Sequence, residues 1–391
     1  MDTDIGRRSL KLHEQVRGKI AVASRMELTS RADLSLAYTP GVAAVCEAIA
    51  DEPDQAHTLT IKNNTVAVVT DGSAVLGLGN IGPLAALPVM EGKALLFKEF
   101  ADIDAWPICL DTQDTGAIID TVRRIAPVFG GVNLEDISAP RCFEVERALQ
   151  DLGIPVFHDD QHGTAIVLLA GLINAARVTG RRMDEMRVVI NGAGAAGVAI
   201  ARLLRCIGQT PEVCTPVDDI ILCDSKGIIH RGRDGLTPIK QELLEITNRA
   251  NRVGTLQDAL RDADVFIGVS KGNLLNGDDI RTMADAPIIF AMANPTPEIM
   301  PDDATAAGAA VVGTGRSDFP NQVNNVLVFP GIFRGALDAM APQITDEMKI
   351  AAARALSEAV DRPIADCVLP DPLDKSVAAH VADAVRRASS A

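Results

Sequence analysis

The sequence predicts an α/β protein in which a doubly wound parallel sheet follows a second, smaller α/β domain. The chain has 391 residues, which is too long for one ordinary domain. From Gly163 onward, short β-branched runs alternate with helix-like stretches, a pattern typical of a parallel sheet covered by helices. A glycine-rich turn joins one such run directly to the next helix. We place the domain boundary near residue 160, with domains over 1–160 and 161–391.

The first domain is expected to mix short strands with helices. Strand-like apolar runs occupy 65–70, 107–110, 131–137 and 155–158. Helix-like stretches occupy 84–100, 116–125 and 141–152. The last two strand-like runs each end in two adjacent carboxylates. Because open α/β sheets bind their ligands beyond the carboxyl ends of the strands, a ligand site is expected at this edge.

The second domain shows a simpler alternation. A long apolar helix over 164–178 leads into the run 188–204. Further strands are expected at 220–223, 265–269, 287–291 and 310–313, with helical stretches between several of them. The final segment, 331–391, is rich in alanine and is expected to be mostly helical.

Charge and hydropathy argue against several classes of partner. The formal net charge of −15 argues against a nucleic-acid or anionic-membrane surface. The longest apolar stretch, 165–176, is too short to span a bilayer. The first residues contain no hydrophobic segment of the kind that secretory signals carry. We therefore expect a cytoplasmic protein with a small-molecule substrate, no nucleic-acid partner and no membrane.

The cysteines and histidines do not favour a zinc site. The seven cysteines include no C-x-x-C pair, and scattered free thiols in a reducing cytosol fit them better than disulfides. His158 and His162 lie beside an acidic pair, but both are expected to be ordinary, partly buried histidines.

One of two G-x-G-x-x-G matches is predicted to bind a dinucleotide. It contains Gly192, Gly194, Ala195, Ala196 and Gly197, and a strand runs straight into it while a helix leaves it at once. This arrangement directs backbone N–H groups and a helix N-terminus at a pyrophosphate, as in a Rossmann-type domain. The other match, 77–82, does not follow a strand directly, and it is interpreted as a close-approach loop lining a cleft.

The identity of the dinucleotide stays open between NAD and NADP. Asp224 ends the next strand, where a carboxylate can hold the adenosine ribose hydroxyls, and the extra chain before it forms the loop 208–219. This carboxylate favours an unphosphorylated ribose. Lys226, Arg231 and Arg233 follow closely, however, and could neutralise a 2′-phosphate.

The two acidic pairs suggest a divalent cation. Glu135 and Asp136 end one strand-like run, and Asp159 and Asp160 end another. Converging carboxylates repel one another unless a cation lies between them. Oxygen ligands without cysteine favour Mg²⁺ or Mn²⁺, sharing coordination with substrate oxygens.

A single tyrosine and a lysine on an apolar helix are further candidates. Tyr38 is the only tyrosine in the chain, and the Thr39-Pro40-Gly41 turn follows it. Lys93 lies on a helix that is otherwise apolar, so its side chain either extends to water or is buried for a purpose. Composition alone favours the exposed position.

Eight motifs in matching order together resemble those of the malic enzymes, most closely the short bacterial form. They are YTPGVA at Tyr38, DGSAVLGLGNIG at Asp71, PVMEGKALLF at Pro88, NLEDI at Asn133, FHDDQHGTA at Phe157, INGAGAAG at Ile190, ANPTPE at Ala293 and NQVNNVLVFPG at Asn321. The resemblance covers most of residues 30–340. It implies oxidative decarboxylation of L-malate to pyruvate and CO₂, with reduction of NAD(P) and a requirement for Mg²⁺ or Mn²⁺.

The resemblance also implies a role for each matching residue. It makes Tyr38 the general acid and Lys93 the general base, and it implies contacts to substrate and nicotinamide from Asn294 and Asn325. It makes Glu135, Asp136 and Asp160 the metal ligands, with Asp159 as their neighbour. A free lysine has a pKa of about 10.4, and we expect burial near a cation to lower that of Lys93 by about 2–3 units.

One position departs from the family pattern. Larger members carry an arginine that clamps the substrate carboxylate, and Ala74 stands at that position here. Lys98 and Arg141 are the candidates to replace it. The short members resemble dimers in which the N-terminal part reaches the neighbouring site, so a homodimer or higher homo-oligomer is expected.

Three other functions are weighed against this one. A malolactic-type enzyme would keep the nicotinamide bound and release lactate. A metal-free amino-acid dehydrogenase would share the second domain but would not need the acidic pairs. A non-catalytic dinucleotide sensor would make the combination of Tyr38, Lys93 and the carboxylates a coincidence.

Overall fold

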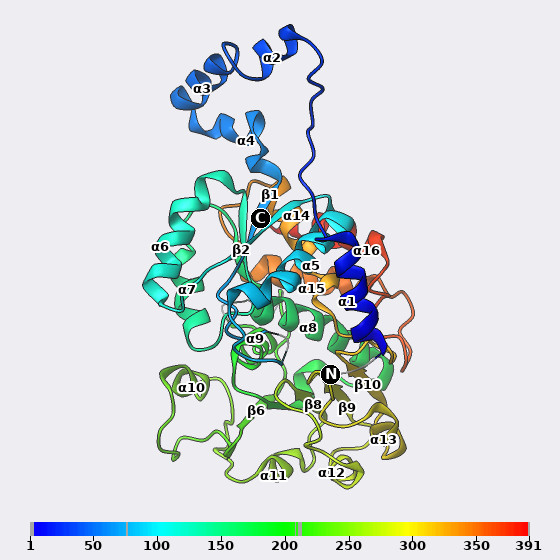
Figure 1. Ribbon diagram of the computed structural model, residues 1–391. Helices are drawn as coiled ribbons and strands as arrows, with labels where there is room; N and C mark the ends of the chain where they lie inside the picture. The colour runs from blue at the N-terminus through cyan, green and yellow to red at the C-terminus, as the bar shows by residue number, and fades with distance from the viewer. Residues whose placement is uncertain (1–3, 76, 208, 210–212, 390–391) are drawn as a thin grey trace.

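The protein contains one parallel and one mainly parallel sheet, with helices on their faces (Figure 1). The computed structural model describes residues 4–75, 77–207, 209 and 213–389. The loop expected over 208–219 therefore lies partly outside the described residues. The α/β prediction is confirmed in both halves of the chain.

The first sheet has four parallel strands in the order β2-β1-β3-β4. Their bounds are β1 Thr65–Thr70, β2 Asp104–Cys109, β3 Gly131–Leu134 and β4 Val156–His158. The helices on its faces are α5 (Pro83–Ala101), α6 (Thr115–Ile125) and α7 (Arg141–Leu149). Successive residues of β1 point to opposite faces, so Val66 and Val68 join the core with α5 while Val69 packs with α6 and α7.

The second sheet has six strands in the order β10-β9-β8-β5-β6-β7. They are β5 Arg187–Asn191, β6 Asp219–Asp224, β7 Gly227–Ile228, β8 Val265–Gly268, β9 Ile288–Ala291 and β10 Val311–Thr314. Only β7, which pairs with β6, is antiparallel among these strands. The chain leaves β5 toward β6 and later returns to its other side with β8, which makes the sheet doubly wound. The helices of this domain are α9 (Ala195–Leu204), α10 (Pro238–Leu243), α11 (Leu256–Leu260), α12 (Gly277–Arg281) and α13 (Pro301–Ala306).

Helix α8 (Asp159–Thr179) joins the two sheets through the centre of the molecule (Figure 1). By length and composition it could cross a membrane, but most of it is buried inside the protein. It packs against α9 and against α15 (Asp346–Glu358). Helices α14 (Phe329–Asp338) and α16 (Lys375–Ala388) pack on α5, so the C-terminal helices also cover the first domain.

The N-terminal arm, residues 4–64, contributes nothing to the core. It contains α1 (Asp4–Val16), α2 (Arg31–Ala37), α3 (Val42–Asp51) and α4 (Ala56–Leu59), and none of its residues is buried. Figure 1 shows α2, α3 and α4 projecting from the body of the molecule. Its exposed apolar side chains include Leu10, Val22, Met26, Leu28 and Leu36.

Short 3₁₀ turns complete the secondary structure. They are η1 (Pro53–Gln55), η2 (Ile61–Asn64), η3 (Ala126–Val128), η4 (Met183–Glu185) and η5 (Asn325–Leu327). Two element boundaries beside the acidic pairs differ from expectation. The strand expected over 131–137 stops at Leu134, and the helix expected from residue 164 already begins at Asp159, so each acidic pair lies just beyond a strand.

The expectation that all seven cysteines are free thiols is wrong for one pair. Cys206 and Cys214 form a disulfide, with their Cα atoms 5.7 Å apart. That separation lies within the range a disulfide can bridge. The sequence spacing alone did not reveal the pair. The other five cysteines are free.

Candidate active site

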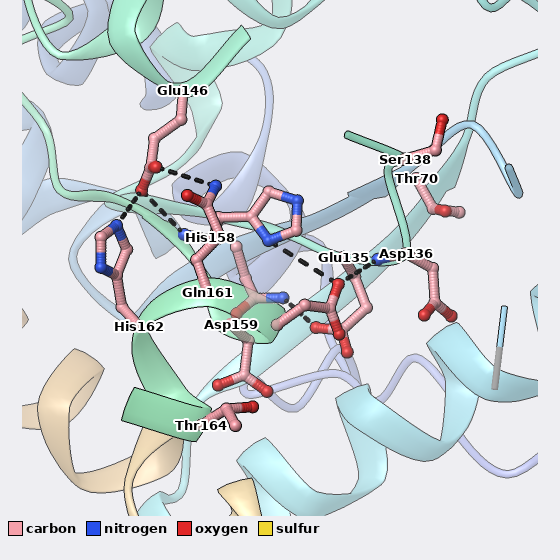
Figure 2. Close-up of polar contacts among 12 residues, drawn as sticks. Thr70, Glu135, Asp136, Ser138, Glu146, His158, Asp159, Gln161, His162 and Thr164 are labelled. Carbon is pink, nitrogen blue, oxygen red and sulfur yellow. Dashed lines mark hydrogen bonds and ion pairs between the residues drawn. The ribbon is translucent and has the colours of Figure 1, made fainter. Parts of the chain in front are cut away.

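The two acidic pairs meet at the carboxyl edge of the first sheet. Strands β3 and β4 are neighbours, with Leu134 opposite His158, so the residues that follow them lie side by side. Carboxylate oxygens of Glu135, Asp136 and Asp160 all lie within 4.8 Å of one another. Figure 2 shows Glu135 and Asp136 in this region together with the start of α8. The predicted convergence of the acidic pairs is therefore present in the fold.

Backbone hydrogen bonds hold these carboxylates in place. Asp136 has a positive φ of 54°, a left-handed conformation that aspartate tolerates better than most residues. In this conformation its N–H donates to Asp160 Oδ2 at 2.8 Å, and its carbonyl accepts from the Ala74 N–H at 3.0 Å. Asn133 Nδ2 donates to Glu135 Oε2 at 2.8 Å. The acidic cluster is thus ordered by the chain itself.

Lys93 lies inside this acidic cluster. Its Nζ is 2.6 Å from Asp159 Oδ2 and 3.0 Å from Glu135 Oε1, and only 10% of its side chain is exposed. The ammonium also lies 4.1 Å above the ring centre of Phe329, within the range of a cation–π contact. The exposed position that composition favoured is therefore wrong, because Glu135, just after β3, and Asp159, at the start of α8, provide partners for the buried charge.

The expected lowering of the Lys93 pKa assumes a neighbouring cation, and the protein's own groups alone shift this pKa upward. Burial alone lowers the pKa of the ammonium, but attraction to Asp159 and Glu135 outweighs burial and raises it above its ordinary value. Burial likewise raises the pKa of Glu135 well above the usual range, against the opposing attraction of Lys93. The protein's own groups thus favour a protonated lysine, and lowering its pKa requires additional positive charge beside the carboxylates.

Asp159 is fixed by groups from the second domain. Asn325 Nδ2 donates to Asp159 Oδ2 at 3.0 Å, and Thr164 Oγ1 donates to Asn325 Oδ1 at 3.2 Å. A Cβ atom at Gly163 would lie 1.9 Å from Asp159 Oδ1. Gly163 therefore has to lack a side chain for Asp159 to occupy its position beside Lys93.

The second glycine-rich loop has the geometry predicted for a dinucleotide site. A Cβ at Gly192 would lie 2.8 Å from the Val269 carbonyl oxygen, and one at Gly197 would lie 1.8 Å from the Gly192 carbonyl oxygen. These glycines allow the turn to pack closely between β5, α9 and the loop after β8. No described atom lies within 4 Å of a Cβ at Gly194, and α9 begins at the next residue, Ala195. The open side of the turn thus faces space suited to a pyrophosphate.

Asp224 ends β6, as expected, but two basic side chains form ion pairs with its carboxylate. Arg233 Nη2 lies 2.5 Å and Lys240 Nζ 2.6 Å from Asp224 Oδ2. Burial raises the pKa of this carboxyl, but the hydrogen bonds from Arg233 and Lys240 outweigh burial and lower it to about 2. Arg231 instead donates to the carbonyls of Leu244 and Asn248. Sequence reasoning missed Lys240, because nothing in its local pattern distinguishes it from a surface lysine on α10.

Comparison with known proteins identifies the family. Residues 17–150 match the family described as malic enzyme, N-terminal domain, and residues 161–390 match the family described as malic enzyme, NAD binding domain. The chain belongs to the malic enzyme family.

Individual malic enzymes are similar along nearly the whole chain. The bifunctional malic/malolactic enzyme of Bacillus subtilis is 56% identical over 97% of this chain and 92% of that protein. The NAD-dependent malic enzyme of Geobacillus stearothermophilus is 53% identical over 99% of this chain and 79% of that protein. The crystal structure of an NAD-dependent malic enzyme from Thermotoga maritima has 47% identity and a TM-score of 0.92, covering 97% of this chain and 98% of that one.

These comparisons confirm three predictions. They confirm the family, the α/β fold with a Rossmann-type domain, and NAD(P)-dependent oxidative decarboxylation of malate as the activity of an enzyme. The domain boundary near residue 160 and the individual site residues stay predictions.

Two of the residues expected in the malic enzyme site are exposed in this chain. Tyr38 follows α2 on the N-terminal arm, is 67% exposed, and is carried away from the sheet with that arm (Figure 1). Asn294 is exposed in the loop after β9. Its carbonyl oxygen lies 2.9 Å from where a Cβ of Gly77 would be, so the close approach predicted for the loop 77–82 is confirmed at Gly77.

The two candidates for the substrate-carboxylate clamp differ in position. Lys98 pairs with Asp102 and with Asp104, the first residue of β2. Asp104 lies at the amino ends of the parallel strands, whereas the acidic cluster lies beyond their carboxyl ends. The prediction that Lys98 clamps the substrate carboxylate is therefore wrong.

Arg141 lies on the correct side of the sheet. Its guanidinium is 2.7 Å from Asp71 and donates to Ser73 Oγ at 3.0 Å. Ser73 precedes Ala74, whose N–H binds Asp136. Arg141 therefore stays the candidate clamp.

We expect Gly163→Ala to lower kcat for malate by about 100-fold, because the new methyl group would displace Asp159 from Lys93 and Asn325. Steady-state kinetics measure this, and the dissociation constant of the dinucleotide should not change. Gly92→Ala is the matched control, since only Lys19 Nζ, at 3.9 Å, lies within 4 Å of its Cβ. A Gly163→Ala enzyme as fast as the control would contradict this role.

We expect Lys240→Ala to raise KM for NADP about 10-fold more than KM for NAD, because a 2′-phosphate near Asp224 would lose one of two cations. Arg249→Ala is the control, because Arg249 pairs with Asp218 at the opposite end of β6. Equal changes of KM for the two dinucleotides would show that Lys240 does not contribute to the choice between them.

Proposed function

We propose that the oxidative decarboxylation of L-malate to pyruvate and CO₂ by this protein requires a divalent cation, Mg²⁺ or Mn²⁺, held by Glu135, Asp136 and Asp160. The observation that carries this proposal is the buried ammonium of Lys93 within a cluster of four carboxylates. Three carboxylates with oxygens within 4.8 Å of one another form a donor set that fits a hard cation. No cysteine is among the donors.

Lys93 is the proposed base for the substrate hydroxyl. The lysine acts as a base only after its ammonium has lost a proton, and Asp159 Oδ2 at 2.6 Å is a nearby acceptor for that proton. The amine then takes the proton of the C2 hydroxyl while hydride leaves C2 for the nicotinamide. When bound, the cation supplies the positive charge that polarises the substrate oxygens and lowers the Lys93 pKa.

The later steps need an amide and an acid. Asn325 is held by Asp159 and Thr164, so its amide has a fixed orientation toward the same cluster and can orient the substrate. After CO₂ departs, Tyr38 is the proposed donor of the proton that C3 of enolpyruvate receives. Asn294, next to the loop 77–82, is the proposed contact to the nicotinamide carboxamide.

We further propose that Tyr38 acts in the site of a second copy of the chain, in a homodimer or higher homo-oligomer. The N-terminal arm exposes apolar side chains and has no buried residue, which fits a segment that is covered by another subunit. The phenol of Tyr38 is largely exposed on this arm. Such an exchange would place the general acid near the partner's lysine.

A malolactic reaction is the second candidate. The relative from Bacillus subtilis is named a bifunctional malic/malolactic enzyme, and it is 56% identical to this chain. In that reaction the reduced nicotinamide would remain bound and return its hydride to pyruvate, giving lactate.

Cytoplasmic location also stays a prediction, supported by the five free cysteines and opposed by the one disulfide.

A direct assay tests the proposed reaction. We expect L-malate, Mn²⁺ and either NAD or NADP to give reduced dinucleotide and pyruvate, and EDTA to stop the reaction because it removes the cation. The absorbance of reduced nicotinamide and chemical identification of the acid measure the outcome. Lactate without accumulation of reduced dinucleotide would favour the malolactic reaction, and undiminished turnover in EDTA would contradict metal dependence.

Subunit mixing tests the exchange of Tyr38. Tyr38→Phe and Lys93→Ala should each be nearly inactive alone. In mixed dimers one site would combine Tyr38 and Lys93 from different subunits, so equal mixing should restore about a quarter of wild-type activity. Mixing after reversible dissociation, followed by the malate assay, measures this. If the mixture is no more active than its components, Tyr38 and Lys93 do not meet across subunits.

A further inference from the structure

A buried carboxylate outside the proposed chemistry binds the start of α8. Glu146 lies on α7, and its side chain is only 12% exposed. Its Oε1 accepts the backbone N–H of His158 at 3.2 Å and lies 2.8 Å from His162 Nε2. Its Oε2 accepts from Gln161 Nε2 at 3.1 Å.

These three contacts bracket two residues of the acidic cluster. His158 precedes Asp159 and Asp160, and Gln161 and His162 follow them. Figure 2 shows Glu146 on one side of the start of α8 and Glu135 with Asp136 on the other. Glu146 therefore binds the first turn of α8 on one side. On the other side, Asp159 of α8 contacts Lys93 and Asp160 of α8 contacts Asp136.

The same contacts reach the metal ligand Asp160 through a histidine. The ring of His158 is buried, and its Nδ1 is 3.7 Å from Asp160 Oδ2. Glu146 fixes the backbone of His158 and hence the position from which this ring approaches Asp160. Groups that orient metal ligands commonly change metal affinity when they are removed.

We propose that Glu146 is a positioning residue, which holds the first turn of α8 so that Asp160 is presented to Glu135 and Asp136 as a ligand set. This inference rests on the proposed metal-dependent function. Only an ionised carboxylate satisfies all three donors, because an amide at this position would offer one acceptor oxygen instead of two. Burial would raise the pKa of Glu146, but His162 outweighs it and the pKa is lowered to about 2, so the group stays ionised.

A cavity beside Glu146 makes its substitution feasible. A cavity of about 290 Å³ is lined by Glu146, Gln161 and His162 together with residues of α9 and α15. Truncation of Glu146 enlarges this space, and water can enter it to hydrate the freed donors of Gln161 and His162, which also line it. The variant is therefore expected to fold, with its effect concentrated on the start of α8.

Metal binding by the purified full-length chain tests the inference without relying on activity. We expect Glu146→Ala to raise the Mn²⁺ dissociation constant about 10-fold or more, measured by electron paramagnetic resonance of free Mn²⁺. Glu146→Gln should have a smaller effect, because its amide oxygen can still accept the His158 N–H. Glu144→Ala is the matched control, since Glu144 lies on the same helix and is exposed. Dinucleotide affinity should be unchanged in all three variants.

The remaining outcomes separate this inference from the proposed function. If Glu146→Ala does not fold, Gln161→Met removes one of the three donors and should give a several-fold weaker Mn²⁺ affinity. Mn²⁺ affinity within about twofold of wild type in the folded variants would overturn the positioning role. An equal loss of Mn²⁺ and dinucleotide affinity would also overturn the positioning role, because it would indicate general damage to the fold. Absence of Mn²⁺ binding by the wild-type chain would instead overturn the proposed metal site.

Discussion

The central constraint on this fold is the burial of one ammonium among four carboxylates. Lys93 has to reach Asp159 and Glu135 from α5, because a buried charge without partners would be strongly unfavourable. This requirement fixes how α5 lies on the first sheet and how α8 begins after β4. It also accounts for the absence of a side chain at Gly163, where any methyl group would occupy the space of the Asp159 carboxylate.

The same cluster connects the two domains. Asn325 belongs to the second domain, yet its amide binds Asp159 at the edge of the first sheet. Phe329, at the start of α14, provides the ring beneath the Lys93 ammonium. A substrate at this cluster would therefore contact both domains. The glycine-rich turn before α9 would bind the dinucleotide at the edge of the second sheet. Glu146 supports the same region from α7, on the side away from Glu135 and Asp136 (Figure 2).

The strands and the positions of the acidic pairs could be predicted from the sequence, because they depend on the hydrophobic pattern of neighbouring residues. Strand β1 matches its expected bounds, and both acidic pairs were placed correctly because they follow buried strands. Sequence reasoning failed where distant residues decide the outcome. Composition alone favoured an exposed Lys93, because its partner Asp159 lies 66 residues away, and the contact between Asn325 and Asp159 spans 166 residues. The pairing of Asp224 with Lys240 and the disulfide between Cys206 and Cys214 join residues that hydrophobic periodicity does not relate to one another.

Anomalous diffraction from crystals grown with Mn²⁺ tests the central claim most directly. We expect a manganese peak bounded by oxygens of Glu135, Asp136 and Asp160, with the amine of Lys93 within hydrogen-bonding distance of Asp159. A manganese peak away from these three carboxylates, or a Lys93 side chain extended into solvent, would contradict it.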